Sequence, residues 1–297
     1  MSTPLHEINE PAVYSLEDFA HGRPEAIMQA SPDVEQRIFM MWPHGNELLG
    51  PSVGHHMYTQ RPDLLERVDY MCGNPLAAEQ EPQRRYTEGI TPGYTKEGTD
   101  LNRSFSPDID PQSYEEARAR KISEIITNGN YGYVLDVHTS TTDFGSCFLI
   151  GEQYREEPAV REIIAASPIS NIVVMPENIP YGDKQVPLVT TGLIGNFANS
   201  VSIEYNRDLA AKVGVEETIK TIDGLIAGQS LYGRRKRHFF NVDDFMWKTQ
   251  DPGPDAKNFE LCEYGYYPVL YGENTYRKDP TKPYLGFAAS TRDIEIL

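Results

Sequence analysis

The sequence contains few cysteines and no long apolar run. Its three cysteines, Cys72, Cys147 and Cys262, are too few and too scattered for a disulfide framework or a paired-cysteine metal site, so we expect them to be reduced. No apolar stretch approaches the roughly 18 residues that a membrane-spanning helix needs. Residues 1–19 lack the basic start and apolar core of a secretory signal. We therefore expect a cytoplasmic protein without a transmembrane segment.

Positive charge is also scarce, because 27 Lys and Arg residues stand against 44 Asp and Glu residues, giving a formal net charge of −17. This excess repels nucleic acid and anionic membranes. The short basic run at residues 234–237 is more typical of a solvated helix end than of a nucleic-acid site. We expect neither nucleic acid nor membrane as a partner, whereas a homo-oligomer is compatible with the sequence. An anionic substrate would need cations gathered locally at its site.

Strand-like and helix-like segments alternate over most of the chain. Short apolar runs predict strands at 37–42, 67–72, 133–138, 147–150, 171–175 and 201–204, and periodic or helix-compatible stretches predict helices at 48–60, 113–128, 159–166 and 209–231. Such alternation is typical of an α/β protein with a mixed, mostly parallel central sheet and helices on both faces. After Arg237 the chain becomes aromatic and β-prone. We predict a catalytic α/β domain over residues 1–237 and a small β-rich capping domain over residues 238–297.

Residue types that commonly bind metals stand at or just after the ends of two predicted strands. His44 and Glu47 follow the first strand, and His138 ends the strand at 133–138. The carboxyl ends of parallel strands meet at one edge of a sheet, where ligands bind. Catalytic zinc typically takes three such protein ligands and a water. The pattern therefore favours one zinc ion held by His44, Glu47 and His138, with Asp136 placed to orient an imidazole.

Structural roles for the same residues stay open at this point. His44 is also compatible with a strand-end histidine bonded to the backbone, Glu47 with a first-turn carboxylate stabilised by the helix dipole, and His138 with a hydrogen-bonded core imidazole. His55 and His56 compete as ligands, although neighbouring positions of a helix point in two directions. The spacing alone is only suggestive of a metal site.

Six segments of the chain, taken in order, carry a family pattern. They are Pro43-His44-Gly45-Asn46-Glu47, Gly73-Asn74-Pro75, Asp100-Leu101-Asn102-Arg103, Asp136-Val137-His138-Thr139-Ser140-Thr141, Ile203-Glu204 and Gly272-Glu273-Asn274-Thr275-Tyr276. Together they resemble the aspartoacylase and succinylglutamate desuccinylase family, whose members share a zinc carboxypeptidase-like fold. The resemblance implies that His44, Glu47 and His138 bind zinc. It also implies that Glu204 activates the zinc-bound water and returns its proton to the leaving nitrogen.

The resemblance also implies a set of substrate residues. Arg85 would stabilise the oxyanion, with Arg84 as the alternative because thirteen residues, 87–99, separate the pair from the next motif. Asn102 and Arg103 would bind a substrate carboxylate, for which the planar guanidinium is suited. Tyr276, from the capping domain, would contact the substrate.

The stretch before Glu204 departs from the family pattern. Aspartoacylases carry a tyrosine and an arginine there that help to hold the aspartyl carboxylates, and residues 185–201 contain neither. Thr139 stands where aspartoacylases usually have asparagine. Either Arg207 or Lys184 substitutes for the missing cation, or the substrate carries one carboxylate fewer.

These observations predict a zinc-dependent hydrolase that cleaves the amide bond of a small N-acylated amino acid. One alternative is a zinc carboxypeptidase or peptidoglycan amidase on the same fold, against which the aromatic cap argues because it would exclude long peptides. Another is a non-catalytic small-molecule-binding protein. The presence of all three predicted ligands and of Glu204 argues against that class.

Overall fold

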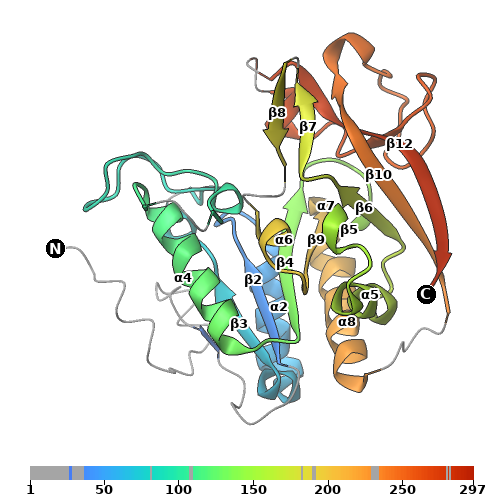
Figure 1. The fold of residues 1–297 in the computed structure, drawn as a ribbon. Helices are drawn as coiled ribbons and strands as arrows, with labels where there is room; N and C mark the ends of the chain where they lie inside the picture. Colours follow the sequence, from blue (N-terminus) through green and yellow to red (C-terminus); the bar gives the residue numbers. More distant parts are fainter. Residues whose placement is uncertain are drawn as a thin grey trace.

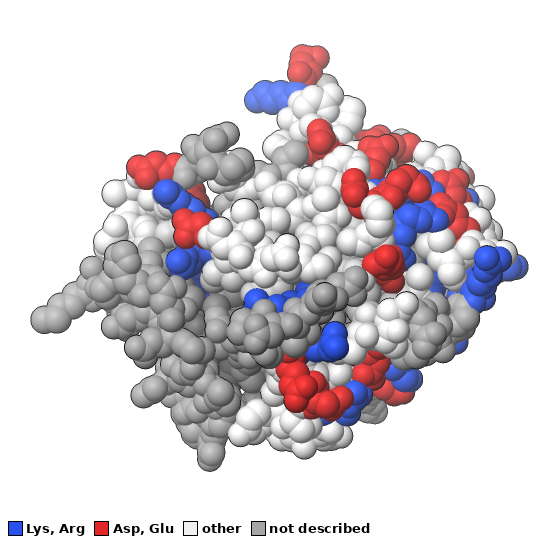
Figure 2. Space-filling view, turned by 60° about the horizontal axis from the view of Figure 1, so that its bottom comes forward, with Lys and Arg blue, Asp and Glu red and all other residues white. Residues whose placement is uncertain are grey.

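A computed structural model describes residues 27–28, 37–80, 82–106, 110–181, 183–188, 192–228, 234–278, 280 and 282–297. The segment over which we expect no secretory signal, residues 1–19, lies outside this range. Among the described residues, no helix has the length and apolar character needed to cross a membrane. On the face drawn in Figure 2, the described acidic and basic side chains are interspersed, and no extended basic patch is in view.

One ten-stranded sheet runs through the molecule in the order β1-β3-β2-β4-β9-β5-β6-β10-β12-β11 (Figure 1). Its strands are β1 (Ile27–Met28), β2 (Ile38–Trp42), β3 (Val68–Cys72), β4 (Tyr133–Ser140), β5 (Ser146–Gly151), β6 (Asn171–Met175), β9 (Ser200–Asn206), β10 (Lys236–Trp247), β11 (Tyr267–Val269) and β12 (Tyr284–Ile296). Strands β3, β2, β4 and β9 are mutually parallel, as are β5, β6 and β10. Strands β2, β3 and β4 are buried at every position, as expected for parallel strands covered on both faces.

Helices cover both faces of this sheet. On one face, α2 (Leu49–Gln60), α5 (Pro158–Ala166) and α8 (Val215–Ala227) share one apolar core with the sheet. On the other face, α4 (Tyr114–Gly129) and α6 (Leu193–Asn196) pack against a second cluster. The short helical elements are η2 (Pro62–Glu66), α3 (Pro75–Glu79), η3 (Leu101–Arg103), η4 (Glu152–Tyr154), α7 (Arg207–Leu209), η5 (Ala210–Gly214), η6 (Lys248–Gln250) and α9 (Asn274–Arg277). The predicted mixed, mostly parallel α/β architecture is confirmed.

Two of the predicted helices show how local sequence sets their limits. Helix α4 begins at a capping box, in which Ser113 and Glu116 satisfy each other's backbone N–H groups, and it ends at Asn130 in the left-handed region (φ 50°). The helix predicted over residues 209–231 is interrupted, because the π-helical turn η5 precedes α8. Gly228, with φ 64°, ends α8. Residues 229–231 lie outside the described part of the chain.

The C-terminal segment adds strands to the central sheet. Strand β10 pairs in parallel with β6 and, along its whole length, antiparallel with β12, and β12 pairs with β11. A separate hairpin, β7 (Asn178–Tyr181) and β8 (Lys184–Pro187), stands at the top of Figure 1, on the side toward which the arrowhead of β4 points. The predicted β-rich appendage is thus present, although its strands continue the sheet. The division into two domains at residue 237 remains a prediction.

Candidate active site

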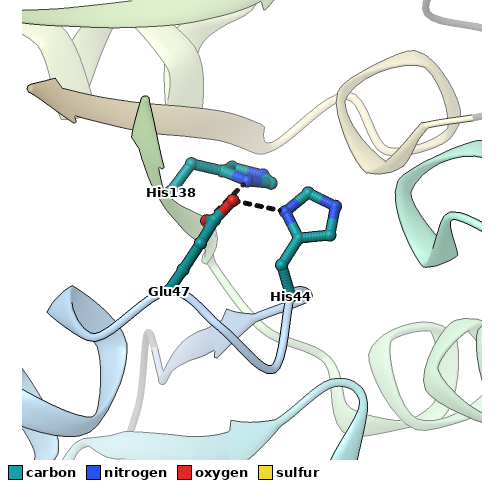
Figure 3. Close-up of side chains that lie close together, drawn as sticks. All are labelled: His44, Glu47 and His138. Carbon is teal, nitrogen blue, oxygen red and sulfur yellow. Dashed lines mark hydrogen bonds and ion pairs between the residues drawn. The ribbon is translucent and has the colours of Figure 1, made fainter. Parts of the chain in front are cut away.

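The three predicted metal ligands converge at the carboxyl edge of the sheet (Figure 3). His44 and Glu47 lie between β2 and α2, and His138 lies near the end of β4, which pairs in parallel with β2. One ligand atom from each residue lies within 4.8 Å of the others, and all three side chains are buried. Gly45 makes the turn possible, because a Cβ atom there would lie 2.3 Å from the backbone nitrogen of Ala78.

Each imidazole is oriented by a second carboxylate. The Nε2 atom of His44 lies 2.9 Å from Oδ1 of Asp100, and Nε2 of His138 lies 2.8 Å from Oδ2 of Asp136. Both nitrogens of each ring thus face a carboxylate oxygen, and a metal bound at Nδ1 would leave the ring hydrogen on Nε2, where Asp100 or Asp136 accepts it. The Nδ1 atoms lie 2.7 Å (His44) and 3.3 Å (His138) from the Glu47 oxygens. Two imidazole nitrogens and a carboxylate oxygen, with such outer partners, are a donor set that suits catalytic zinc.

Glu47 is held in the anionic form that a metal requires. Burial acts to raise the pKa of this carboxyl, but the neighbouring imidazoles of His44 and His138 outweigh it and bring the pKa well below its ordinary range. The backbone N–H of Thr139 also donates to Oε2 of Glu47 at 2.9 Å.

Glu204 lies directly across the ladder from His138, because β4 and β9 pair in parallel with these two residues in register. Glu204 lines the same cavity as two of the predicted ligands, Glu47 and His138. Burial raises the pKa of Glu204 to about 7, and the charges of Glu47 and Glu273 act in the same direction, opposed by His138 and Arg85. A carboxyl with this pKa can both accept and return a proton at neutral pH.

A cavity of about 630 Å³ adjoins these residues and is lined by all four predicted substrate residues, Arg85, Asn102, Arg103 and Tyr276. The Nε and Nη2 atoms of Arg85 donate to Oδ2 of Asp100 at 3.2 and 3.1 Å. Its Nη1 atom lies 3.4 Å from Oε1 of Glu47. The adjacent Arg84 does not line the cavity.

The segment that carries Tyr276 is fastened to the end of β4. The carboxylate of Glu273 accepts hydrogen bonds from the hydroxyl of Ser140, from the backbone N–H of Thr141 at 2.8 Å and from the Thr141 hydroxyl at 3.0 Å. The hydroxyl of Thr142 donates to the backbone oxygen of Tyr271. The polar run after His138 therefore positions the C-terminal contribution to the cavity.

Several cavity residues were not found from the sequence. Lys282 lines the cavity, with Nζ 5.3 Å from the ring centroid of Tyr276. By contrast, Arg207 and Lys184, the two candidates for the missing cation, are exposed and do not line it. Lys282 follows no local motif, and only its proximity in sequence to Tyr276 could have suggested it. Glu273 stood inside a quoted motif without a role.

The model of the succinylglutamate desuccinylase/aspartoacylase catalytic domain matches residues 43–187. Residues 43–187 are similar to this catalytic domain. The matched range includes the three predicted ligands, Arg85 and Arg103, and it ends before Glu204 and Tyr276. No curated protein gives a significant match.

Solved structures with similar folds include murine aminoacylase 3, with 17% identity, a TM-score of 0.59 and coverage of 90% of this chain and 98% of that chain. Succinylglutamate desuccinylase from Vibrio parahaemolyticus has 11% identity, a TM-score of 0.56 and coverage of 90% and 87%. The Chromobacterium violaceum enzyme of that name has 13% identity, a TM-score of 0.54 and coverage of 88% and 85%. At these identities the likeness is one of fold.

Proposed function

We propose that the protein is a zinc-dependent hydrolase that cleaves the amide bond of a small N-acylated amino acid, with one zinc ion per chain held by His44, Glu47 and His138. The family match supports a hydrolase acting on acylated amino acids. The proposal of a metal rests on the buried group of His44, Glu47 and His138. The Nε2 atoms of the two imidazoles are hydrogen-bonded to Asp100 and Asp136. A zinc ion there supplies a Lewis acid and acidifies a water molecule.

Four residues of this chain would then have distinct roles in hydrolysis. Glu204 takes the proton of the attacking water and returns it to the leaving nitrogen, for which its raised pKa is suited. Arg85, fixed by Asp100, stabilises the negative charge that develops on the carbonyl oxygen. Arg103, at the polar side of the cavity, holds the substrate carboxylate, and Tyr276 contacts the substrate from the C-terminal segment.

The size of the cavity favours a small molecule over a polypeptide. Sites for small ligands typically occupy about 300 to 1,000 Å³, and this cavity measures about 630 Å³. Hairpin β7–β8 and strands β10 and β12 contribute to its walls. These features support a deacylase over a carboxypeptidase or a peptidoglycan amidase.

The test is a screen of N-acetyl, N-formyl and N-succinyl amino acids, together with a peptide and a peptidoglycan fragment, against zinc-loaded protein. We expect hydrolysis of one or more acylated amino acids and loss of turnover on chelation of the metal. The control is zinc-loaded Glu204→Gln, which should bind substrate without turning it over. Preference for the peptide or the peptidoglycan fragment would favour the alternative enzymes, and absence of any hydrolysis would favour a binding protein.

A further inference from the structure

One side of the cavity is apolar. Its lining side chains there come from β5, β6, α6, β10, β12, hairpin β7–β8 and the segment after each of β8 and β11, and we call this set the apolar wall: Leu149, Met175, Val186, Leu188, Ile194, Phe245, Leu270 and Phe287. These residues belong to, or pack against, one hydrophobic cluster of the protein. The apolar wall is therefore the part of that hydrophobic cluster that lines the cavity.

Carboxylates outnumber cations among the described charged residues that line the cavity. The described lining includes three cations, Arg85, Arg103 and Lys282, against four carboxylates. Arg85 is already bound to Asp100 and lies beside Glu47. One substrate carboxylate can be paired with Arg103, and Lys282 is the remaining cation of the described lining. A substrate carboxylate placed against the apolar wall would be an unpaired buried charge, which is strongly disfavoured.

Building on the function proposed above, we propose that the apolar wall is a subsite for an apolar group of the substrate. The preferred substrate is then a monocarboxylic N-acyl amino acid with a bulky aliphatic or aromatic group, in place of an N-acyl aspartate or glutamate. The reaction is unchanged, since water adds across the C–N bond and gives a carboxylic acid and an amine. Selectivity comes from removing apolar surface of both partners from water.

Two substrate series identify the group that occupies the wall. In the first, N-acetyl derivatives of alanine, leucine, phenylalanine and aspartate vary the amino-acid side chain. In the second, acetyl, butyryl and hexanoyl derivatives of alanine vary the acyl group. We expect kcat/KM to rise tenfold or more either from N-acetylalanine to N-acetylphenylalanine or from N-acetylalanine to N-hexanoylalanine, because even one methylene in an apolar pocket is worth about tenfold or more. The proposal is overturned if both series are flat or if N-acetylaspartate is the best substrate.

A matched pair of variants ties this preference to the wall. Leu149→Asn places an amide in the wall, and Leu65→Asn makes the same change at another partly buried leucine that packs against a different core. Leu149→Asn should lower the ratio of kcat/KM for the best apolar substrate over N-acetylalanine by about tenfold. Leu149→Met should retain the ratio, as should Leu65→Asn. Equal ratios in the two asparagine variants would contradict the assignment.

A binding measurement separates this inference from the proposed hydrolysis. Zinc-loaded Glu204→Gln is titrated calorimetrically with N-acetylphenylalanine, N-hexanoylalanine and N-acetylaspartate. Tighter binding of either apolar ligand by tenfold or more supports the subsite even if the wild type hydrolyses none of them, in which case only the proposed function fails. Binding of N-acetylaspartate equal to or tighter than that of both apolar ligands overturns the subsite.

Discussion

Replacing Glu115 with glutamine should destabilise the protein and weaken substrate binding. Glu115 is a fully buried carboxylate of α4. Its Oε1 atom accepts hydrogen bonds from Nδ2 of Asn74 at 3.0 Å and from the backbone N–H of Thr87 at 2.8 Å, and its Oε2 atom accepts from the backbone N–H of Thr99 at 3.2 Å. One side chain thus closes both ends of residues 87–99, the stretch that separates Arg85 from the next motif.

The expected cost follows from these three hydrogen bonds. A glutamine keeps one oxygen acceptor, but its amide group places hydrogens where Oε2 now accepts from Thr99. One hydrogen bond to a charged group, worth about 1.5 to 3 kcal/mol, is lost at the half-buried N–H of Thr99. We therefore expect a loss of about 1.5 to 3 kcal/mol in the free energy of unfolding. We also expect a higher KM, because Asn102 and Arg103 closely follow Thr99.

The assay is denaturant-induced unfolding at neutral pH, with steady-state kinetics on the same samples. Glu124→Gln is the matched control, since Glu124 lies on the exposed side of the same helix with ion-pair distances of 3.5 to 3.8 Å. That control should change stability by less than about 0.5 kcal/mol. The reasoning is refuted if Glu115→Gln unfolds at the same denaturant concentration as Glu124→Gln.

Three further substitutions test the other assigned residues. Glu204→Gln should keep its zinc yet lower kcat by at least a hundredfold, as a lost general base does. Burial raises the pKa of Glu204 from 4.5 to about 7, so the melting temperature of the metal-free wild type should fall as pH rises through this range. The same fall should be weaker in the glutamine variant. Arg103→Ala should mainly raise KM, and a pure kcat effect would place Arg103 at the reacting carbonyl. Tyr276→Phe should lower kcat/KM for the preferred substrate by the roughly 1 to 2 kcal/mol of one hydrogen bond, and an unchanged value would remove its hydroxyl from the site.

Much of the fold follows from local pattern. The helix predicted over residues 113–128 is observed at Tyr114–Gly129, because an N-terminal capping box and an apolar stripe define it in the sequence alone. The buried strand before His44 was equally clear. The π-helical turn ahead of α8 was not predicted, because π-helical turns are rare and carry no distinct local sequence signal. The pairing of β10 with β6 was also not predicted, since aromatic β-prone segments do not specify which strand they join.

Some residues of the candidate site could be predicted from the sequence, and others could not. His44, Glu47 and His138 could be named because strand ends place them at a shared sheet edge, and the structure brings them together. Glu115 could not be named, since tertiary packing brings Thr87 to it, and Lys282 follows no local motif. The apolar wall likewise comes from strands, a hairpin and a short helix that are far apart in sequence. Its parts resemble ordinary core residues until the fold opens one side of the cluster to the cavity.

The catalytic zinc ion that we propose at His44, Glu47 and His138 can be located by anomalous diffraction at the zinc edge from crystals of zinc-loaded protein. We predict one strong peak per chain about 2.0 to 2.2 Å from Nδ1 of each histidine and from a carboxylate oxygen of Glu47. Absence of a peak between these three side chains, or a peak bound only by residues elsewhere such as His55 and His56, would contradict this ligand assignment.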